Sequence, residues 1–199
     1  AVVRLRGICT AVADNRGEFA GIRLLIATRR DIDIEEPATD DPFAGAVVPM
    51  ASLRRFGPLQ TPYRRVRVTG VVTYADPGHW LVVQDGDAGL EVLARATEKW
   101  VPGDSVEVVG FPGRQGNRIV LREAQVRRAP ERPAPAPVEL PAVPPPNPEW
   151  DNQLVRGTAV LDAILGTGVE LHLLLKAGDE RFVAYMPQAE GDRTALRRG

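Results

Sequence analysis

The chain has 199 residues, a formal net charge of −1 and a hydrophobic share of 44%. This length and composition allow one or two ordinary domains with a buried core, and they exclude a collagen-like or broadly disordered chain. The near-neutral charge, with acids and bases interspersed, argues against an obligate nucleic-acid binder, which normally carries a basic stripe that neutralises phosphates.

Simple counts exclude further classes. Cys9 is the one cysteine, so no disulfide can form within the chain. Its place on the strand parity of Val3 and Leu5 predicts a small buried side chain rather than a nucleophile. No apolar run approaches the roughly 18 residues of a membrane-spanning helix, so we expect no direct membrane contact here. The chain starts without Met and directly in a strand, so we expect a section of a longer polypeptide.

The first 36 residues predict two long strands. In AVVRLRGICTAV, apolar residues alternate with Arg4 and Arg6, which is typical of a strand with one buried face. The turn residues DNRGEFAG separate it from a second strand pattern, IRLLIATRRDIDI. Residues 37–62 then form a loose proline-containing linker, with a short helix expected over residues 50–56.

Residues 63–130 have the clearest pattern, that of five strands. RRVRVTGVVTYADPG, HWLVVQDG and DAGLEVLA are followed by a short helix expected at residues 96–100, and then by SVEVVGFPGRQGN and RIVLREAQVRR. Gly70 and Gly110 lie in mid-strand, where a glycine often marks a bend at a barrel corner. This order and length predict a small OB-like barrel.

Residues 150–199 repeat the first part of this block after a proline-rich spacer over residues 131–149. In QLVRGTAVLDAILGTGVELHLLLKAGDERFVAYM, Gly157 takes the place of Gly70, and three strands are expected. A short helix is expected at residues 192–198, after which the fourth and fifth strands are missing.

Residues 1–36 supply the missing strands, because their pattern matches that of the fourth and fifth strands of the middle block. The sequence therefore predicts an all-β chain of tandem OB-fold-like five-stranded barrels, one complete and one circularly permuted. The permuted barrel would be residues 150–199 closed by residues 1–36, either within one chain or by a neighbouring chain in head-to-tail self-association. We favour closure within one chain, because it has the higher effective concentration.

Three motifs carry a family resemblance: VRVTGVVTY, LVVQDGDAGL and PGDSVEVVG. With them, the chain resembles the tandem OB-like β modules in the extracytoplasmic regions of bacterial membrane sensor histidine kinases and related signalling proteins. This resemblance implies a non-catalytic sensory or spacer module of a two-component protein, periplasmic in location, whose partners are other modules of the same protein. The same strand pattern also occurs in nucleic-acid-binding OB domains, so a soluble nucleic-acid-binding protein is the alternative, with a cytoplasmic location.

The expected ligand surface of the middle block lies on its second and third strands and their loops, where OB folds hold ligands. Aromatic side chains there could stack on bases or sugars, but packing at the end of the barrel is the simpler interpretation. Trp100 and Trp150, beside proline-containing turns, are expected to pack between modules. The candidate residues are Tyr74, His79, Trp80, Gln84, Asp85 and Arg67.

The sequence contains no arrangement typical of catalysis. We find no Ser-His-Asp or Cys-His set, no zinc-ligand spacing and no phosphate-binding glycine loop, so no enzyme activity, cofactor or metal is expected. Asp85 and Asp87 flank Gly86 in a pattern that favours a β-turn over a calcium loop. The ligand stays unidentified, nucleic acid is the less favoured partner, and a pure head-to-tail assembly module is a further alternative.

Overall fold

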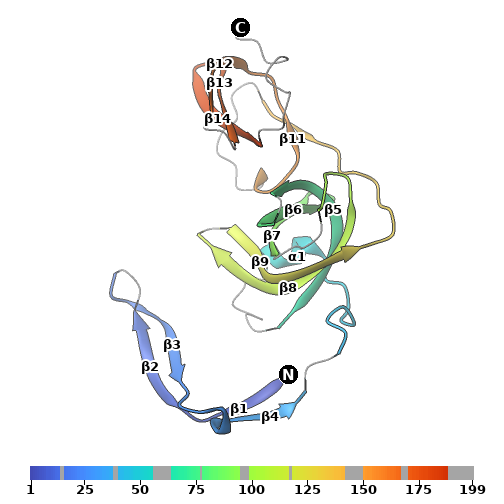
Figure 1. Cartoon of the computed structure of the whole chain (residues 1–199). Helices are drawn as coiled ribbons and strands as arrows, with labels where there is room; N and C mark the ends of the chain where they lie inside the picture. The colour runs from blue at the N-terminus through green and yellow to red at the C-terminus, as the bar shows by residue number, and fades with distance from the viewer. Residues whose placement is uncertain are drawn as a thin grey trace. The chain divides into compact units, whose positions relative to one another are not determined.

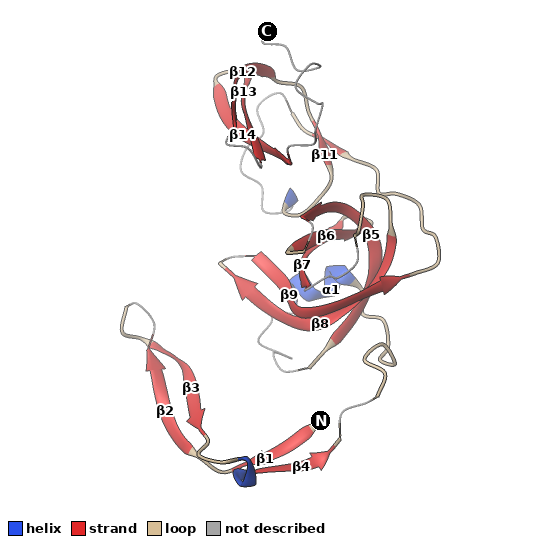
Figure 2. Cartoon of the chain, viewed as in Figure 1, coloured by secondary structure: helices blue, strands red, loops and turns tan. Residues whose placement is uncertain are grey.

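The computed structural model describes residues 1–13, 16–37, 40–55, 64–76, 78–94, 99–116, 118–141, 150–166 and 170–187. Its regular structure is almost entirely β-strand, as Figure 2 shows. The chain divides into two compact units, Ala1–Ala44 and Gly45–Gly199. The all-β class predicted from the sequence is therefore confirmed.

The first unit is a two-stranded ribbon, which we call the N-terminal ribbon (residues 1–36; Figure 1). The half next to the hairpin turn pairs β2 with β3, and the half next to the N-terminus pairs β1 with β4, both antiparallel. The elements are β1 (Val2–Leu5), β2 (Ile8–Ala13), β3 (Phe19–Leu25), the one-turn 3-10 helix η1 (Arg29–Asp31) and β4 (Ile32–Glu36).

The second unit contains a closed five-stranded barrel with the strand order β5-β6-β7-β9-β8. This is the strand order of an OB fold, in which the first strand pairs with both the second and the fourth. The parallel pair of β7 and β9 closes it. The strands are β5 (Val66–Asp76), β6 (Trp80–Asp85), β7 (Ala88–Ala94), β8 (Ser105–Gln115) and β9 (Arg118–Arg128).

The barrel encloses the main core of the chain. Alternate residues of each strand face inward, as the two-residue period of a strand requires. Met50 of helix α1 (Met50–Arg55) is buried in the same core, so the predicted helix at residues 50–56 is confirmed. The barrel residues that are at most 1% exposed in this core are Val68, Val72, Val83, Val92, Val106, Val108 and Leu121.

The rest of the second unit is a three-stranded antiparallel sheet, β12-β13-β14, preceded by a short parallel pair, β10 and β11. We call the three strands the C-terminal sheet. The elements are β10 (Val138–Glu139), β11 (Val155–Arg156), β12 (Val160–Gly166), β13 (Glu170–Ala177) and β14 (Glu180–Pro187).

The N-terminal ribbon repeats the β8–β9 hairpin in detail. Both are long hairpins bent at a glycine of the first strand, Gly7 or Gly110. A Cβ on Gly7 would lie 2.5 Å from the carbonyl oxygen of Leu25, and one on Gly110 would lie 3.1 Å from that of Arg122. Leu25 and Arg122 pair with equivalent residues, Ile8 and Phe111, each one position after the glycine. The predicted repeat is thus reproduced at the level of backbone contacts.

The C-terminal sheet repeats β5, β6 and β7, and two backbone features set the alignment. Val48 N–H donates to the carbonyl of Arg67, as Leu140 N–H donates to that of Arg156, both at 2.7 Å. Six residues after each arginine the strand bulges, at Thr73 in β5 and at Asp162 in β12.

This alignment corrects one detail of the sequence comparison. Gly70 lies three residues before its bulge, whereas Gly157 lies five residues before Asp162. Ala159 therefore takes the place of Gly70, and Gly157 takes that of the buried Val68. The sequence comparison aligned the two strands by one glycine in each, but backbone hydrogen bonds set the register of these strands.

The strands of the N-terminal ribbon and those of the C-terminal sheet each pair within their own unit, and closure of a second barrel within one chain, which the sequence favours, stays a prediction. β1 to β4 pair with one another, and β12 to β14 pair with one another. Local hairpin pairing satisfies backbone groups without closing a chain-long loop. Completion by a neighbouring chain stays a prediction.

Two smaller predictions have other outcomes: the burial of Cys9 is wrong, and two short helices fall wholly or mostly on residues that the structure does not describe. Cys9 is exposed rather than buried, because it lies on a two-stranded ribbon that leaves its side chains open to solvent. The predicted helix at residues 192–198 lies outside the described residues, as does most of that at residues 96–100.

Gly70→Ala tests the close packing of β5 on β6. The added Cβ would lie 2.7 Å from both the carbonyl oxygen of Gln84 and Cγ1 of Val83, so the strands must separate. We expect the free energy of unfolding to fall by about 2–3 kcal/mol in a denaturant titration. Gly45→Ala, where the added Cβ meets nothing within 4 Å, is the control and should change it by less than about 0.5 kcal/mol. Equal effects of the two substitutions would contradict the packing.

Candidate functional site

The outer face of β6 and β7 is the surface on which an OB fold holds ligands. In this chain the side chains of that face are buried rather than open. Val82, Gln84 and Glu91 point away from the barrel core, yet each is less than 9% exposed. Glu91 is contacted from within the barrel, since Nη1 of Arg118 in β9 lies 3.0 Å from its Oε2, whereas Gln84 is bound by a segment outside the barrel.

The segment that binds Gln84 is the chain's own residues 150–154, which precede β11. Leu154 N–H donates to Oε1 of Gln84 at 2.7 Å, while Nε2 of Gln84 donates to the carbonyl of Gly86 at 2.8 Å. Both ends of the buried Gln84 amide are thus satisfied, as burial requires. Gln153 Nε2 also donates to the carbonyl of Asp87 in the β6–β7 turn.

Gly89 of β7 allows the backbone of this segment to approach. A Cβ at Gly89 would lie 1.7 Å from the carbonyl oxygen of Asn152 and 2.4 Å from its carbonyl carbon. No side chain other than hydrogen fits there without moving the segment. Gln84 and Gly89 are cross-strand partners. The Gln84 side chain binds the segment, and the lack of a side chain at Gly89 makes room for it, so we call these two residues the seat of the segment.

Asp85 is held by a residue of the proline-rich spacer, Arg132. Nη2 of Arg132 donates to Oδ1 of Asp85 at 2.6 Å, and Nη1 of Arg132 donates to Oγ1 of Thr69 at 3.3 Å. Ser105 Oγ accepts from the Arg132 backbone N–H at 2.9 Å. Asp85 is thus a partner of the proline-rich spacer.

Tyr74, His79 and Trp80 do come together, at the β5–β6 turn. The rings of Tyr74 and Trp80 lie with centroids 4.9 Å apart and planes tilted by 31°. His79 Nδ1 lies 3.1 Å from Oδ2 of Asp76. Burial, followed by the charges of Asp76 and Glu170, raises the pKa of the Tyr74 hydroxyl, which therefore stays a neutral donor at physiological pH.

Arg67 belongs to neither group. Its Nη2 donates to Oε1 of Glu107 at 2.5 Å, and its Nη1 donates to the carbonyl of Gly45 at 3.1 Å. Glu107 also accepts from Nε of Arg127, at 2.8 Å. The hydrogen bond from Arg67 is the main reason that the pKa of Glu107 lies below its usual value; Arg127 adds to this, and burial opposes it. Arg67 thus ties the start of the second unit to the barrel.

The six candidate residues therefore form three separate groups rather than one site. The alternation of WLVVQD identified the outward parity of Trp80 and Gln84 correctly. Sequence reasoning missed Gly89 and Asn152, because no local pattern shows that a segment far along the chain lies on a strand.

One other aromatic prediction has a definite outcome. Trp100 packs in the barrel core and is 6% exposed, with the Arg128 guanidinium over its ring, so the prediction of packing between modules is wrong for this residue. Its place directly before the turn that leads into β8 puts the ring at the barrel end. His172 is half-buried, with its ring edge against Tyr185 and Nε2 3.1 Å from Glu170.

Across the described part of the chain, no three His, Cys, Asp or Glu side chains are grouped so that they could hold a metal ion. Within the same residues, none of the helices has the length and apolarity needed to cross a membrane.

Comparisons with known proteins add little to this geometry. No protein-family model matches the chain, and no curated protein matches it. The chain is similar to one solved structure described as the molecular basis for abrogation of activation of pro-inflammatory cytokines. The aligned region covers 68% of this chain and 84% of the chain in that structure. At 10% identity and a TM-score of 0.31, this likeness carries no argument about fold or function.

Glu107→Gln tests the charge cluster on Arg67. The pKa of Glu107 is lowered in the folded state, so the carboxylate contributes stability above the unfolded value of about 4.5, and this is lost as pH falls through the lower folded value. We expect the variant to be less stable than the wild type by about 2 kcal/mol at pH 7. The difference should shrink steadily below about pH 4.5 in denaturant titrations.

Glu139→Gln is the matched control, because Glu139 pairs with Arg156 at the surface and both side chains are 68% exposed. It should change stability by less than about 0.5 kcal/mol. A Glu107→Gln deficit that is the same at pH 3 and pH 7 would contradict the assigned role of the carboxylate.

Proposed function

We propose that this chain is a non-catalytic spacer section in a tandem array of OB-like β modules. The observation that carries the proposal is the covered outer face of β6 and β7. There, Gln84 and Gly89 bind the chain's own residues 152–154, so the usual ligand surface holds the start of the next module. A barrel that uses this face to anchor its own chain is suited to connecting modules.

The arrangement of partial modules supports the same proposal. The complete barrel is preceded by a ribbon equivalent to β8–β9 and followed by a sheet equivalent to β5–β7. VRVTGVVTY and LVVQDGDAGL resemble extracytoplasmic modules of bacterial membrane sensor kinases, and from this resemblance we place the array in the periplasmic part of a two-component protein.

The full reading frame tests this location. We expect it to encode a membrane anchor and a kinase domain, and a frame with neither would overturn it.

Gly89→Ala tests the anchoring of the segment. The added Cβ requires the Asn152 carbonyl to move, which breaks the hydrogen bond of Leu154 to Gln84. We expect the Leu154 amide to exchange with deuterium at least about tenfold faster, while amides of β5 to β9 keep their protection. Gly45→Ala is the control and should leave exchange at Leu154 unchanged. Unchanged exchange in Gly89→Ala would mean that the segment is not anchored at this face.

Titration with single-stranded oligonucleotides distinguishes the spacer from a nucleic-acid-binding protein. Electrostatic binding is strongest at low salt, so that is where any affinity should appear. We expect no binding at low salt, because the β6–β7 face is covered. Binding that weakens steeply as salt is added would overturn the proposal in favour of the nucleic-acid alternative.

Ligand sensing is the second candidate function, and the Tyr74–Trp80 pair favours it. This pair lies at the β5–β6 turn, outside the area that residues 152–154 cover. A ligand that stacked on Trp80 would change the tryptophan emission of the wild type but not that of Trp80→Leu.

A further inference from the structure

The N-terminal ribbon and the C-terminal sheet both expose apolar side chains that their counterparts in the barrel bury. Leu5 is 42% exposed, whereas its equivalent in β8, Val108, is fully buried. Phe182 is 38% exposed, whereas its equivalent in β7, Leu90, is 3% exposed. Such faces normally mark a surface that another element covers.

The ribbon's exposed apolar set is large for 36 residues. It comprises Val2, Val3, Leu5, Ile8, Phe19, Ile22, Leu24, Leu25 and Ile34. The corresponding set on the C-terminal sheet comprises Val160, Leu165, Phe182, Val183 and Tyr185.

Among the described residues, no strand pairs with the stretch that leads from β11 into the C-terminal sheet on the edge where the barrel has β8. The carbonyl of Leu154 accepts from Val138 N–H of β10, and that of Arg156 accepts from the N–H of Leu140, the residue after β10. Successive carbonyls of a strand point to opposite edges, so the backbone groups of Val155 and Gly157 face the other edge. On β5, residues 66–71 pair with β8 along this same edge.

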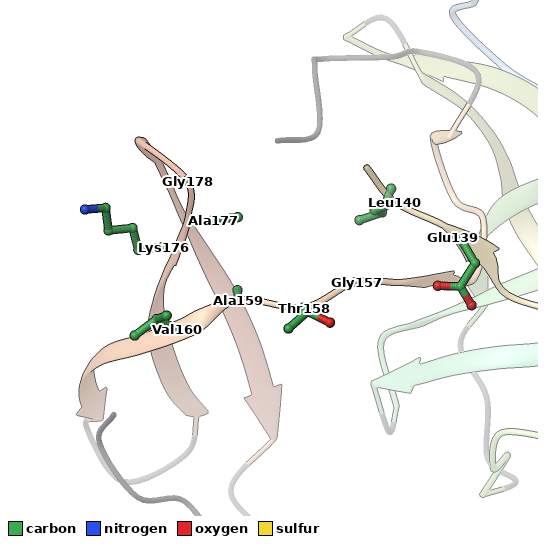
Figure 3. A pocket seen from close by; sticks show the side chains of 9 residues that line it. All are labelled: Glu139, Leu140, Gly157, Thr158, Ala159, Val160, Lys176, Ala177 and Gly178. Carbon is green, nitrogen blue, oxygen red and sulfur yellow. The ribbon is translucent and has the colours of Figure 1, made fainter. Parts of the chain in front are cut away.

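A hollow in the C-terminal sheet matches a large side chain of the ribbon. In the barrel Val68 pairs with Val108, and the equivalent pair would be Gly157 with Leu5. Gly157 lines a cleft of about 430 Å³ between β10–β11 and the β13–β14 turn (Figure 3). Leu140 lines the same cleft, and its Cβ lies 3.4 Å from the position that a Cβ on Gly157 would take, so Leu5 would enter the cleft beside Leu140.

We propose that the N-terminal ribbon of one copy closes the C-terminal sheet of a second copy, as β8–β9 closes β5–β7. β1 would pair antiparallel with residues 155–160, placing Leu5 at the Gly157 cleft. Arg4 and Arg156 would then face each other where the barrel has Glu107 and Arg67. Each already has a carboxylate partner, Glu35 and Glu139 respectively, which limits their repulsion.

The contact is heterologous, since the ribbon and the sheet are different surfaces. It therefore produces chains or rings of copies rather than a symmetric dimer. A second copy is the occupant because it carries the hairpin whose bend and register fit the sheet.

Sedimentation velocity over a concentration series of the full chain is the first test. We expect association that increases with concentration, and Leu5→Asp should weaken it at least about 30-fold. Ile8→Asp is the matched control: Ile8 is 69% exposed but lies on the other parity of the ribbon. If association were non-specific sticking, the more exposed Ile8 would matter more.

A matched pair of substitutions also tests the C-terminal sheet. Phe182→Asp should weaken association to a similar extent, and Val183→Asp should not, although Val183 is 42% exposed and adjacent in sequence. Circular dichroism of each variant checks that its strands remain folded.

Mixing the two defective variants is the decisive step. Leu5→Asp keeps an intact sheet and Phe182→Asp keeps an intact ribbon, so an equimolar mixture should form 1:1 heterodimers and nothing larger. A wild-type chain that stays monomeric at every concentration would overturn the proposal. So would a mixture in which the two variants do not associate.

Discussion

The parallel pair between β7 and β9 is the contact on which the barrel depends. Glu91 pairs with Val120 and Val92 with Leu121, and these few backbone hydrogen bonds convert a five-stranded sheet with two open edges into a closed one. Closure lets the inward residues of all five strands meet in one core, where Val83, Val92 and Leu121 lose essentially all contact with solvent. In the ribbon and the C-terminal sheet, several residues equivalent to buried barrel residues are exposed, among them Leu5 and Phe182.

Much of the fold follows from local patterns in the sequence. Five alternating segments separated by glycine and aspartate turns predict β5 to β9, and the mid-strand Gly110 and Gly7 predict the two bends. These features could be predicted because each depends on a few neighbouring residues: the two-residue period of a strand and the small size of glycine. The repeat could be predicted for the same reason, since both hairpins show the same short signals.

Register and long-range contacts could not be predicted in this way. Gly157 and Gly70 are the same residue type, but the alignment is set by the hydrogen bond to Arg156 and the bulge at Asp162. Neither feature can be identified from the type of a single residue. Gln84 has the polarity of a ligand-binding residue, yet its partner is the amide of Leu154, 70 residues along the chain. Trp100 beside a proline suggests a module edge, but only the closed barrel shows that the ring completes the core.

The seat formed by Gln84 and Gly89 has a consequence for the stiffness of an array. At the equivalent positions of the C-terminal sheet stand Lys176 and Arg181, which are cross-strand partners just as Gln84 and Gly89 are. A protonated lysine has no acceptor for a backbone N–H, and arginine places a long side chain where Gly89 leaves room. A segment laid across the C-terminal sheet could not be held as residues 152–154 are held. In the proposed array, the joint at the C-terminal sheet would therefore lack the hydrogen bond to a buried amide that holds residues 152–154 on the barrel.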